Sequence, residues 1–322
     1  MKKILPTALM LLCAPVLTLQ AEEQPKGKPI AKIFTNFHTG FGPARHDRGF
    51  ELERSYLGYE YQLNEGLTFT GVLDVGQSKQ VDDMQRLAYL KNMMVTWKKQ
   101  KLTLKAGLIP TIQFGQQEKF WDHRYIRKSF QDAYKFGNSA DLGVSVAYNF
   151  NSWLSADALV ANGEGYKKIQ FNDGLLYGAG LTLRPLNGLL VRVYGGINER
   201  VGKAESDHYQ LATFIGYRHE GFSVGAEYNF LRETHTEGDG KPWGLSFYST
   251  VDLSKRMSLF GRYDQLFSDN ATTARGEEQQ ATVGLELSLN RYLKLAPTFT
   301  YKNVKSKDRP EYYAGIYCYF GI

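Results

Sequence analysis

Hydrophobic and polar residues alternate with a period of two along most of the chain. The pattern is clearest over residues 243–253, where Trp243, Leu245 and Phe247 share one face and Ser246 and Thr250 lie on the other. Residues 142–150 and 222–230 repeat the alternation. This period is typical of β-strands with one apolar face, and helical spacing fits none of these segments. The pattern therefore predicts an all-β protein.

The alternating segments predict sixteen strands, at residues 32–40, 50–62, 67–77, 87–97, 102–110, 141–149, 154–162, 175–184, 189–198, 208–219, 222–231, 243–253, 257–265, 279–288, 293–302 and 311–322. Seven short connections alternate strictly with eight longer ones, which range from nine residues at 41–49 to about thirty at 111–140. Short turns at one end and long loops at the other are typical of outer-membrane barrels. We therefore predict a sixteen-stranded antiparallel transmembrane β-barrel with short periplasmic turns, long extracellular loops and an aqueous lumen.

The composition agrees with a barrel better than with a helical membrane protein. Mean hydropathy is −0.39, and no apolar run after residue 21 approaches the roughly 18 residues of a spanning helix. The chain nevertheless holds 21 Tyr, 19 Phe and 32 Gly, which is typical of β-structure. Barrel strands meet lipid on one face only, so their hydrophobicity is diluted by half.

The N-terminus has the layout of a secretory signal peptide. Lys2 and Lys3 precede an apolar run at 4–19, and Ala21 offers a small residue for cleavage. We expect residues 1–21 to be removed and residues 22–322 to form a single barrel in the outer membrane of a Gram-negative-type bacterium. Without Lys2 and Lys3, 37 basic residues face 33 acidic ones, a net charge of +4. This mild excess predicts no nucleic-acid partner, and no residue set predicts a cofactor or a metal site.

The connection at 111–140 is the strongest candidate for a functional segment, because loops of this length are usually functional. It contains seven aromatic residues, three acidic residues and five basic ones: Lys119, Arg124, Arg127, Lys128 and Lys135. Such aromatic density predicts packing against another surface. Folded into the lumen, the segment would form a constriction loop with a net charge of +2. The alternative interpretation is an extracellular cap.

Strand alternation places further basic residues on the lumen wall: Arg54, Lys105, Arg184, Arg192, Arg218, Arg262 and Lys294. Acidic residues share that wall, so the lumen is of mixed sign. Because rings of Arg or Lys favour anions, we expect a weak anion preference. Alternation points Lys91 toward lipid, where a subunit interface or a local shift of register would explain it.

Four segments resemble the phosphate-selective porin O/P family. They are residues 50–60 (FELERSYLGYE), 71–76 (GVLDVG), 88–90 (AYL) and 104–115 (LKAGLIPTIQFG), which precede the constriction loop in that order. The resemblance covers roughly residues 45–140. It implies a sixteen-stranded barrel, a homotrimer and basic residues along the channel. Those channels carry a dense basic ladder, whereas this lumen mixes signs, so the expected solutes are small polar or anionic molecules in general.

Two other functions fit an outer-membrane barrel. Asp82-Asp83 and Asp207-His208 fall at the extracellular rim and resemble the acidic pair and Asp–His pair of omptin proteases, which activate water for peptide cleavage. Omptins, however, have ten strands and space each pair by one residue. A barrel plugged by its long loop would be a structural protein. The sequence favours a porin that is not an enzyme, embedded in outer-membrane lipid.

Overall fold

The computed structural model describes residues 26–63, 66–77, 86–170, 173–199, 207–235, 238–268 and 277–322. The expected signal peptide lies outside these residues. No helix within them is long and apolar enough to cross a membrane.

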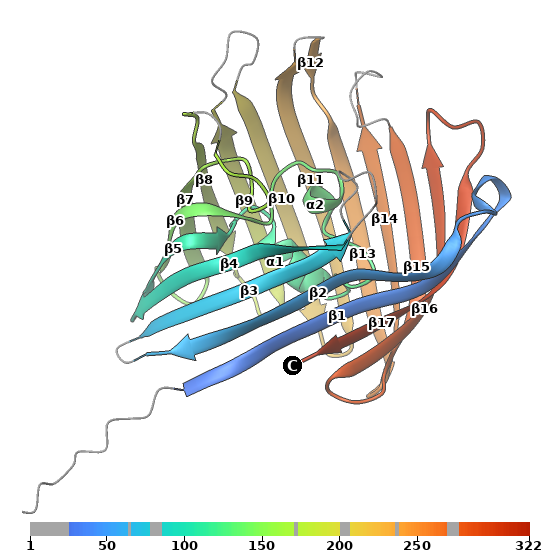
Figure 1. Ribbon diagram of the computed structural model, residues 1–322, viewed down its shortest axis with the longest axis horizontal. Coiled ribbons are helices and arrows are strands. Elements are labelled where there is room, and N and C mark those ends of the chain that lie inside the picture. The colour runs from blue at the N-terminus through green and yellow to red at the C-terminus, as the bar shows by residue number, and fades with distance from the viewer. Residues whose placement is uncertain are drawn as a thin grey trace, which may run out of the picture.

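Sixteen strands of the described chain form one closed antiparallel barrel (Figure 1), as the alternation predicted. They are β1 (Lys26–Phe41), β2 (Arg48–Gln62), β3 (Leu67–Gln77), β4 (Arg86–Lys99), β5 (Leu102–Pro110), β6 (Ala140–Asn149), β7 (Leu154–Ala161), β8 (Leu176–Leu183), β9 (Leu189–Asn198), β10 (His208–His219), β11 (Phe222–His235), β13 (Trp243–Ser254), β14 (Met257–Phe267), β15 (Glu278–Ser288), β16 (Leu293–Val304) and β17 (Glu311–Gly321). Pairing of β1 with β17 closes the barrel, so neither sheet edge is left open. A short strand, β12 (Gly238–Gly240), pairs with the end of β11 beyond the barrel.

The connections sort by length as expected. One end, here called the turn end, has connections of two to five residues at 63–66, 100–101, 150–153, 184–188, 220–221, 255–256 and 289–292. The opposite end is called the loop end. There the β1–β2 connection is 42–47, shorter than the predicted 41–49, and includes a 3₁₀ turn, Gly42–Ala44. Strand β1 begins at Lys26 instead of residue 32, because its first residues pair with the end of β2.

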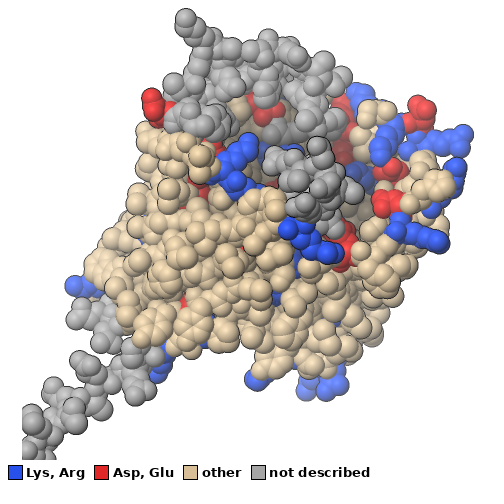
Figure 2. All heavy atoms as spheres, in the orientation of Figure 1, with Lys and Arg blue, Asp and Glu red and all other residues tan. Residues whose placement is uncertain are grey.

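The two faces of the wall differ in the way that alternation requires. Large apolar side chains cover the outward face, and Val144 and Ile316 each remain 54% exposed there. Figure 2 shows that charged side chains gather toward the ends of the visible flank and are sparse across its middle. A continuous apolar surface of this kind fits contact with lipid.

Three bulges or register irregularities interrupt the pairing of the described strands, and one of them corrects the expected position of Lys91. Val72 pairs with Asn92 and Leu73 with Leu90, so Lys91 is an extra residue in β4. An extra residue re-aims the side chains around it. The Lys91 ammonium donates a hydrogen bond of 3.2 Å to the hydroxyl of Tyr56 inside the barrel. Lys91 therefore faces the lumen and not lipid, and of the two explanations offered for it the local shift of register is the one that the structure supports. The other two leave Glu53 unpaired in β2 and Leu253 unpaired in β13.

The 111–140 loop folds into the barrel and carries two short helices, α1 (Gly115–Trp121) and α2 (Phe130–Ala133), which lie within the ring of strands in Figure 1. The predicted inward-folded constriction loop is thus present. Helix α1 ends at Asp122, whose φ of 60° terminates the helix in the left-handed region.

We predict that Val283→Arg, on the outward face of β15, lowers the free energy of unfolding by about 2–4 kcal/mol, because the charge would enter the apolar lipid layer. Val283 is 49% exposed there. The control, Thr300→Arg, places the same side chain on the lumen face of β16 and loses a 3.0 Å hydrogen bond with Thr282, worth about 1 kcal/mol. Urea unfolding from lipid bilayers measures both. Equal losses for the two variants would contradict this assignment of faces.

Candidate functional site

The first half of the 111–140 loop is held by aromatic packing. Trp121 is 2% exposed, and its ring centroid lies 5.3 Å from that of Tyr248 and 6.0 Å from that of Phe260. Phe120 packs edge-on against Phe214 at 5.1 Å. Aromatic pairs at these separations add about 0.5–1.5 kcal/mol each to the gain from burial. The aromatic residues, whose density predicted a packed loop, therefore hold the first half of the loop against the barrel wall.

The second half of the loop forms a separate apolar cluster at the loop end. Phe130 and Phe136 are almost fully buried and pack with Leu231 of β11 and Leu266 of β14. The Tyr134 hydroxyl donates to the Glu278 carboxylate at 3.0 Å. Both halves of the loop thus pack mainly against the wall formed by β10 to β15, and Tyr125 also packs against Phe34 of β1 and Tyr319 of β17.

Three arginines of the wall fix the backbone of the loop. Arg192 donates to the carbonyl oxygen of Ile112 at 2.6 Å, Arg218 to that of Phe120 at 2.7 Å and Arg262 to that of Lys128 at 2.9 Å. A carbonyl inside the barrel needs such a partner, because an unpaired buried polar group is costly. Sequence analysis placed all three arginines on the lumen wall. The structure shows that they position the loop.

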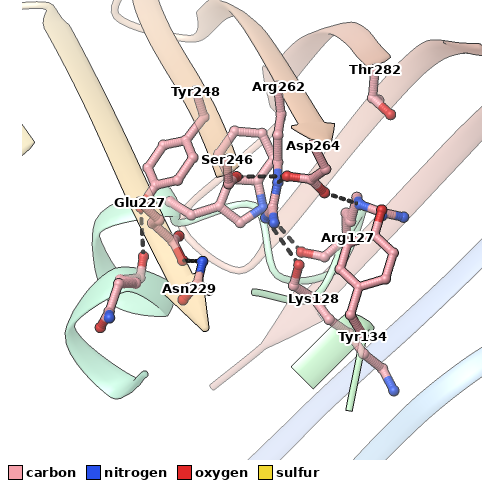
Figure 3. A network of polar contacts seen from close by, with 12 residues as sticks. Arg127, Lys128, Tyr134, Glu227, Asn229, Ser246, Tyr248, Arg262, Asp264 and Thr282 are labelled. Carbon is pink, nitrogen blue, oxygen red and sulfur yellow. Dashed lines mark hydrogen bonds and ion pairs between the residues drawn. The ribbon is translucent and has the colours of Figure 1, made fainter. Parts of the chain in front are cut away.

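Asp264 joins the loop to β14 through a buried network (Figure 3). Its carboxylate accepts from Arg127 at 2.7 Å, from Arg262 at 2.9 Å and from the Ser246 hydroxyl at 2.6 Å. Its side chain is 1% exposed. One carboxylate therefore balances the positive charges of two arginines, of which Arg127 belongs to the loop and Arg262 to the wall. Arg127 was predicted to line the constriction, but its guanidinium is engaged in this contact.

A second set of polar contacts anchors the part of the 111–140 loop that lies nearer the turn end. The Glu286 carboxylate of β15 accepts from Tyr125 at 2.9 Å and pairs with Lys294 of β16 at 3.0 Å. His123 Nε2 lies 3.5 Å from the same carboxylate. Burial lowers the pKa of the His123 imidazole below its ordinary value, although Glu286 opposes this shift. His123 is accordingly neutral at pH 7.

Two cavities remain on the opposite side of the loop, along β1 to β5. The outer cavity, of about 320 Å³, lies between the 111–140 loop, β2, β4 and the β7–β8 connection. Seven basic residues line it, against Asp132 and Glu164: Arg54, Lys91, Arg124, Lys128, Lys135, Lys167 and Lys168. The inner cavity, of about 560 Å³, opens toward the turn end. Six basic residues line it, against Glu118 and Asp122: Lys32, Lys91, Lys119, Arg124, Arg291 and Lys294.

The two cavities share Tyr56, Lys91 and Arg124, which we call the eyelet. The Lys91 ammonium sits 4.6 Å from the Tyr56 ring centroid. Arg124 pairs through Nε with Glu118 at 3.1 Å and through Nη2 with Asp132 at 3.3 Å. Its Nη1 is buried and has no hydrogen-bond partner in the described part of the chain. The eyelet thus presents two cations, of which Lys91 makes no ion pair with any described residue.

A second loop, of which residues 162–170 and 173–175 are described, also bends over the lumen and was not anticipated. Gly163 and Gly165 adopt φ angles of +98° and +83°, which an L side chain would strain. Their amides donate to the Asp141 carboxylate at 2.8 and 3.1 Å. The turn carries Tyr166, whose hydroxyl donates to Asp74, and Lys167, 4.6 Å from the Tyr89 ring centroid. The closely spaced glycines were the available signal for a turn of this kind.

The remaining predicted residues divide between the cavities and the wall. Lys119 lies in the inner cavity, Lys128 and Lys135 lie in the outer one, and Arg54 pairs there with Asp74 at 3.0 Å. Lys105 is half-buried on the lumen face of β5. Arg184 lies at the turn end within 3.4 Å of Ser155. Sequence analysis missed six lining residues: Lys32, Tyr56, Lys91, Lys167, Lys168 and Arg291.

The residues of the alternative functions fall only partly within the described residues. Asp82 and Asp83 of the protease hypothesis lie outside them. Within them, no group of three or more His, Cys, Asp or Glu is placed to hold a metal ion.

We predict that Asp264→Asn releases the 111–140 loop at a cost of about 3–5 kcal/mol. The substitution removes the carboxylate that both buried arginines contact, and it leaves Arg127 only the more distant Glu278, 3.8 Å away. Protease cleavage within the loop and thermal unfolding measure the effect. Asp47→Asn is the matched control, because Asp47 is 59% exposed in its pair with His38 and such pairs contribute about 1 kcal/mol or less. Similar protease resistance in the two variants would contradict the anchoring role of Asp264.

Comparisons with known proteins agree with the barrel architecture. No family model matches the chain, and no curated protein sequence is similar to it. Among solved structures, the chain is similar to an anion-selective porin from Comamonas acidovorans (11% identity, 93% of this chain and 100% of that chain, TM-score 0.68). It is also similar to the outer-membrane channel DcaP of Acinetobacter baumannii (9%, 92% and 97%, 0.68). A third is in-vitro folded OmpT, an outer-membrane protein of Vibrio cholerae, in a trimer form (13%, 92% and 99%, 0.63). The fold is therefore that of the outer-membrane porins.

Proposed function

We propose that the protein is an outer-membrane porin through which small polar solutes diffuse passively, with a preference for anions. The observation that carries the proposal is the charge of the passage. Eleven basic and four acidic residues line the two cavities that meet at the eyelet. Because the wall arginines and Arg127 are engaged with the loop, the passage is lined mainly by lysines.

Several of these lysines are free to act on a passing ion. In the described part of the chain, Lys91, Lys119 and Lys128 form no ion pair. An amine without a carboxylate partner exerts its full charge on the lumen. A unit charge about 10 Å from an ion in water changes that ion's energy by about 0.4 kcal/mol, or a factor of about two in its concentration. Several such charges in one narrow passage favour anions moderately, and salt screens the effect. Phosphate is one of the anions that this passage would admit.

The surroundings of the barrel support the same proposal. The apolar outward face suits outer-membrane lipid, and residues 1–21 have the features of a cleaved signal peptide. We infer a homotrimer, since the similar OmpT of Vibrio cholerae forms a trimer. A porin is favoured over a plugged barrel because the outer and inner cavities beside the loop share the three residues of the eyelet. Neither an enzymatic activity nor a cofactor is needed for diffusion through it.

We predict that, in planar bilayers under a potassium chloride gradient, chloride carries more of the current through the purified protein than potassium does. Lys91→Gln and Lys128→Gln each lower the anion-to-cation permeability ratio about twofold, because each removes one charge from the passage. Lys28→Gln is the control, since Lys28 is 69% exposed and paired with Glu60 near the turn end. A cation preference of the unaltered protein would overturn the proposal.

The same recordings have an expected pH dependence. Burial lowers the pKa of the Lys128 ammonium below the ordinary value of a lysine. Lys128 therefore loses its charge earlier than an ordinary lysine when the pH is raised, and the anion preference falls with it. Between about pH 7 and about pH 10, the unaltered protein loses more of its anion preference than Lys128→Gln does. Equal losses would show that Lys128 does not contribute to selectivity.

A further inference from the structure

The inner cavity combines positive charge with an apolar wall. Ile30 of β1, Val72 of β3 and Pro110 at the end of β5 line it together with Tyr319 of β17. All four side chains remain partly exposed to the lumen. They share the cavity with Lys32 and with the other basic residues at the turn end. The cavity is therefore amphipathic.

The apolar residues occupy positions where a water-filled pore needs none. On the lumen face of β3, Val72 is flanked by Thr70 and Asp74. On β1, Ile30 precedes Lys32 on the same face. A polar residue at either position would face water at no cost, because the lumen of a porin is wet. Packing explains part of the pattern, since Val72 also touches the aromatic cluster around Phe34 and Tyr56. It does not explain Ile30, which is not part of that cluster.

The volume of the inner cavity suits an organic molecule. About 560 Å³ falls within the usual range of small-molecule pockets, roughly 300–1,000 Å³, which pair apolar walls with a few fixed polar groups. A strongly hydrated inorganic anion gains from the charges but nothing from Ile30, Val72 or Pro110. A carboxylate on an apolar body gains from both. Its charged end can meet the ammonium of Lys119 or Lys294, and its body can displace water from the apolar wall.

Resting on the proposed anion-favouring pore, we propose that the inner cavity is a binding site for organic carboxylates with an apolar or aromatic body. Such solutes are retained at the turn side of the eyelet, between the apolar residues Ile30, Val72, Pro110 and Tyr319 and the basic residues around them. The site makes their passage saturable, whereas small hydrated anions pass without binding.

Single-channel recording in dilute potassium chloride tests the proposal, with benzoate, acetate and inorganic phosphate as probes. Benzoate reduces the chloride current in a saturable manner, at concentrations where acetate and phosphate leave the current unchanged. Acetate or phosphate acting as strongly as benzoate would overturn the apolar site, as would the absence of any effect of benzoate on an anion-selective current. If the unaltered protein is not anion-selective before any probe is added, that result would instead overturn the proposed function.

Substitutions separate the apolar contribution from the charge. Val72→Thr keeps the shape of the side chain and its preference for a strand, and it weakens the apparent affinity for benzoate about threefold by removing apolar contact. Ile30→Thr/Val72→Thr weakens it about tenfold, while a persistent anion-selective chloride current reports a folded pore. Lys32→Gln, the control for charge, lowers the anion-to-cation permeability ratio. An unaltered benzoate affinity in the double variant would overturn the proposal.

Discussion

The position of the passage depends on the attachment of the inserted 111–140 loop to one side of the barrel. Backbone carbonyls of the 111–140 loop are inside the protein and need donors, which Arg192, Arg218 and Arg262 supply from the wall. Because the donors all come from β9, β10 and β14, the loop is drawn to that side. The remaining space lies along β1 to β5. The position of the passage is thus a consequence of where the loop finds its hydrogen bonds.

The same attachment changes which charges face the solute. Arginine is suited to hold carbonyls and carboxylates, because its planar guanidinium donates in fixed directions. Arg127 and Arg262 share Asp264, so they add little free charge to the lumen. Lysines such as Lys91, Lys119 and Lys128 are left to line the passage. The mixed signs seen along the lumen wall therefore separate in space: paired charges on the loop side and mostly unpaired amines on the other.

Much of this fold was predictable because barrel strands obey a local rule. Alternation placed sixteen strands within six residues of their observed bounds, and loop length identified the inserted segment. Alternation failed at Lys91, since a bulge adds a residue that only the pairing of β3 with β4 reveals. It also could not distinguish Arg262, which is satisfied by Asp264 and a loop carbonyl, from Lys294 in the inner cavity. That distinction depends on the contact between Arg262 and the Lys128 carbonyl, which are 134 positions apart in the chain.

Thiol modification during single-channel recording tests the position of the passage most directly. Lys91→Cys places a thiol at the eyelet, whereas Ser246→Cys places one behind the loop, where Ser246 is fully buried. Cys318 faces outward on β17, so the unaltered protein serves as the reference. A bulky, water-soluble methanethiosulfonate reagent is expected to reduce the current through Lys91→Cys and to leave Ser246→Cys unchanged. Rapid block of Ser246→Cys with no effect on Lys91→Cys would contradict this account of the pore.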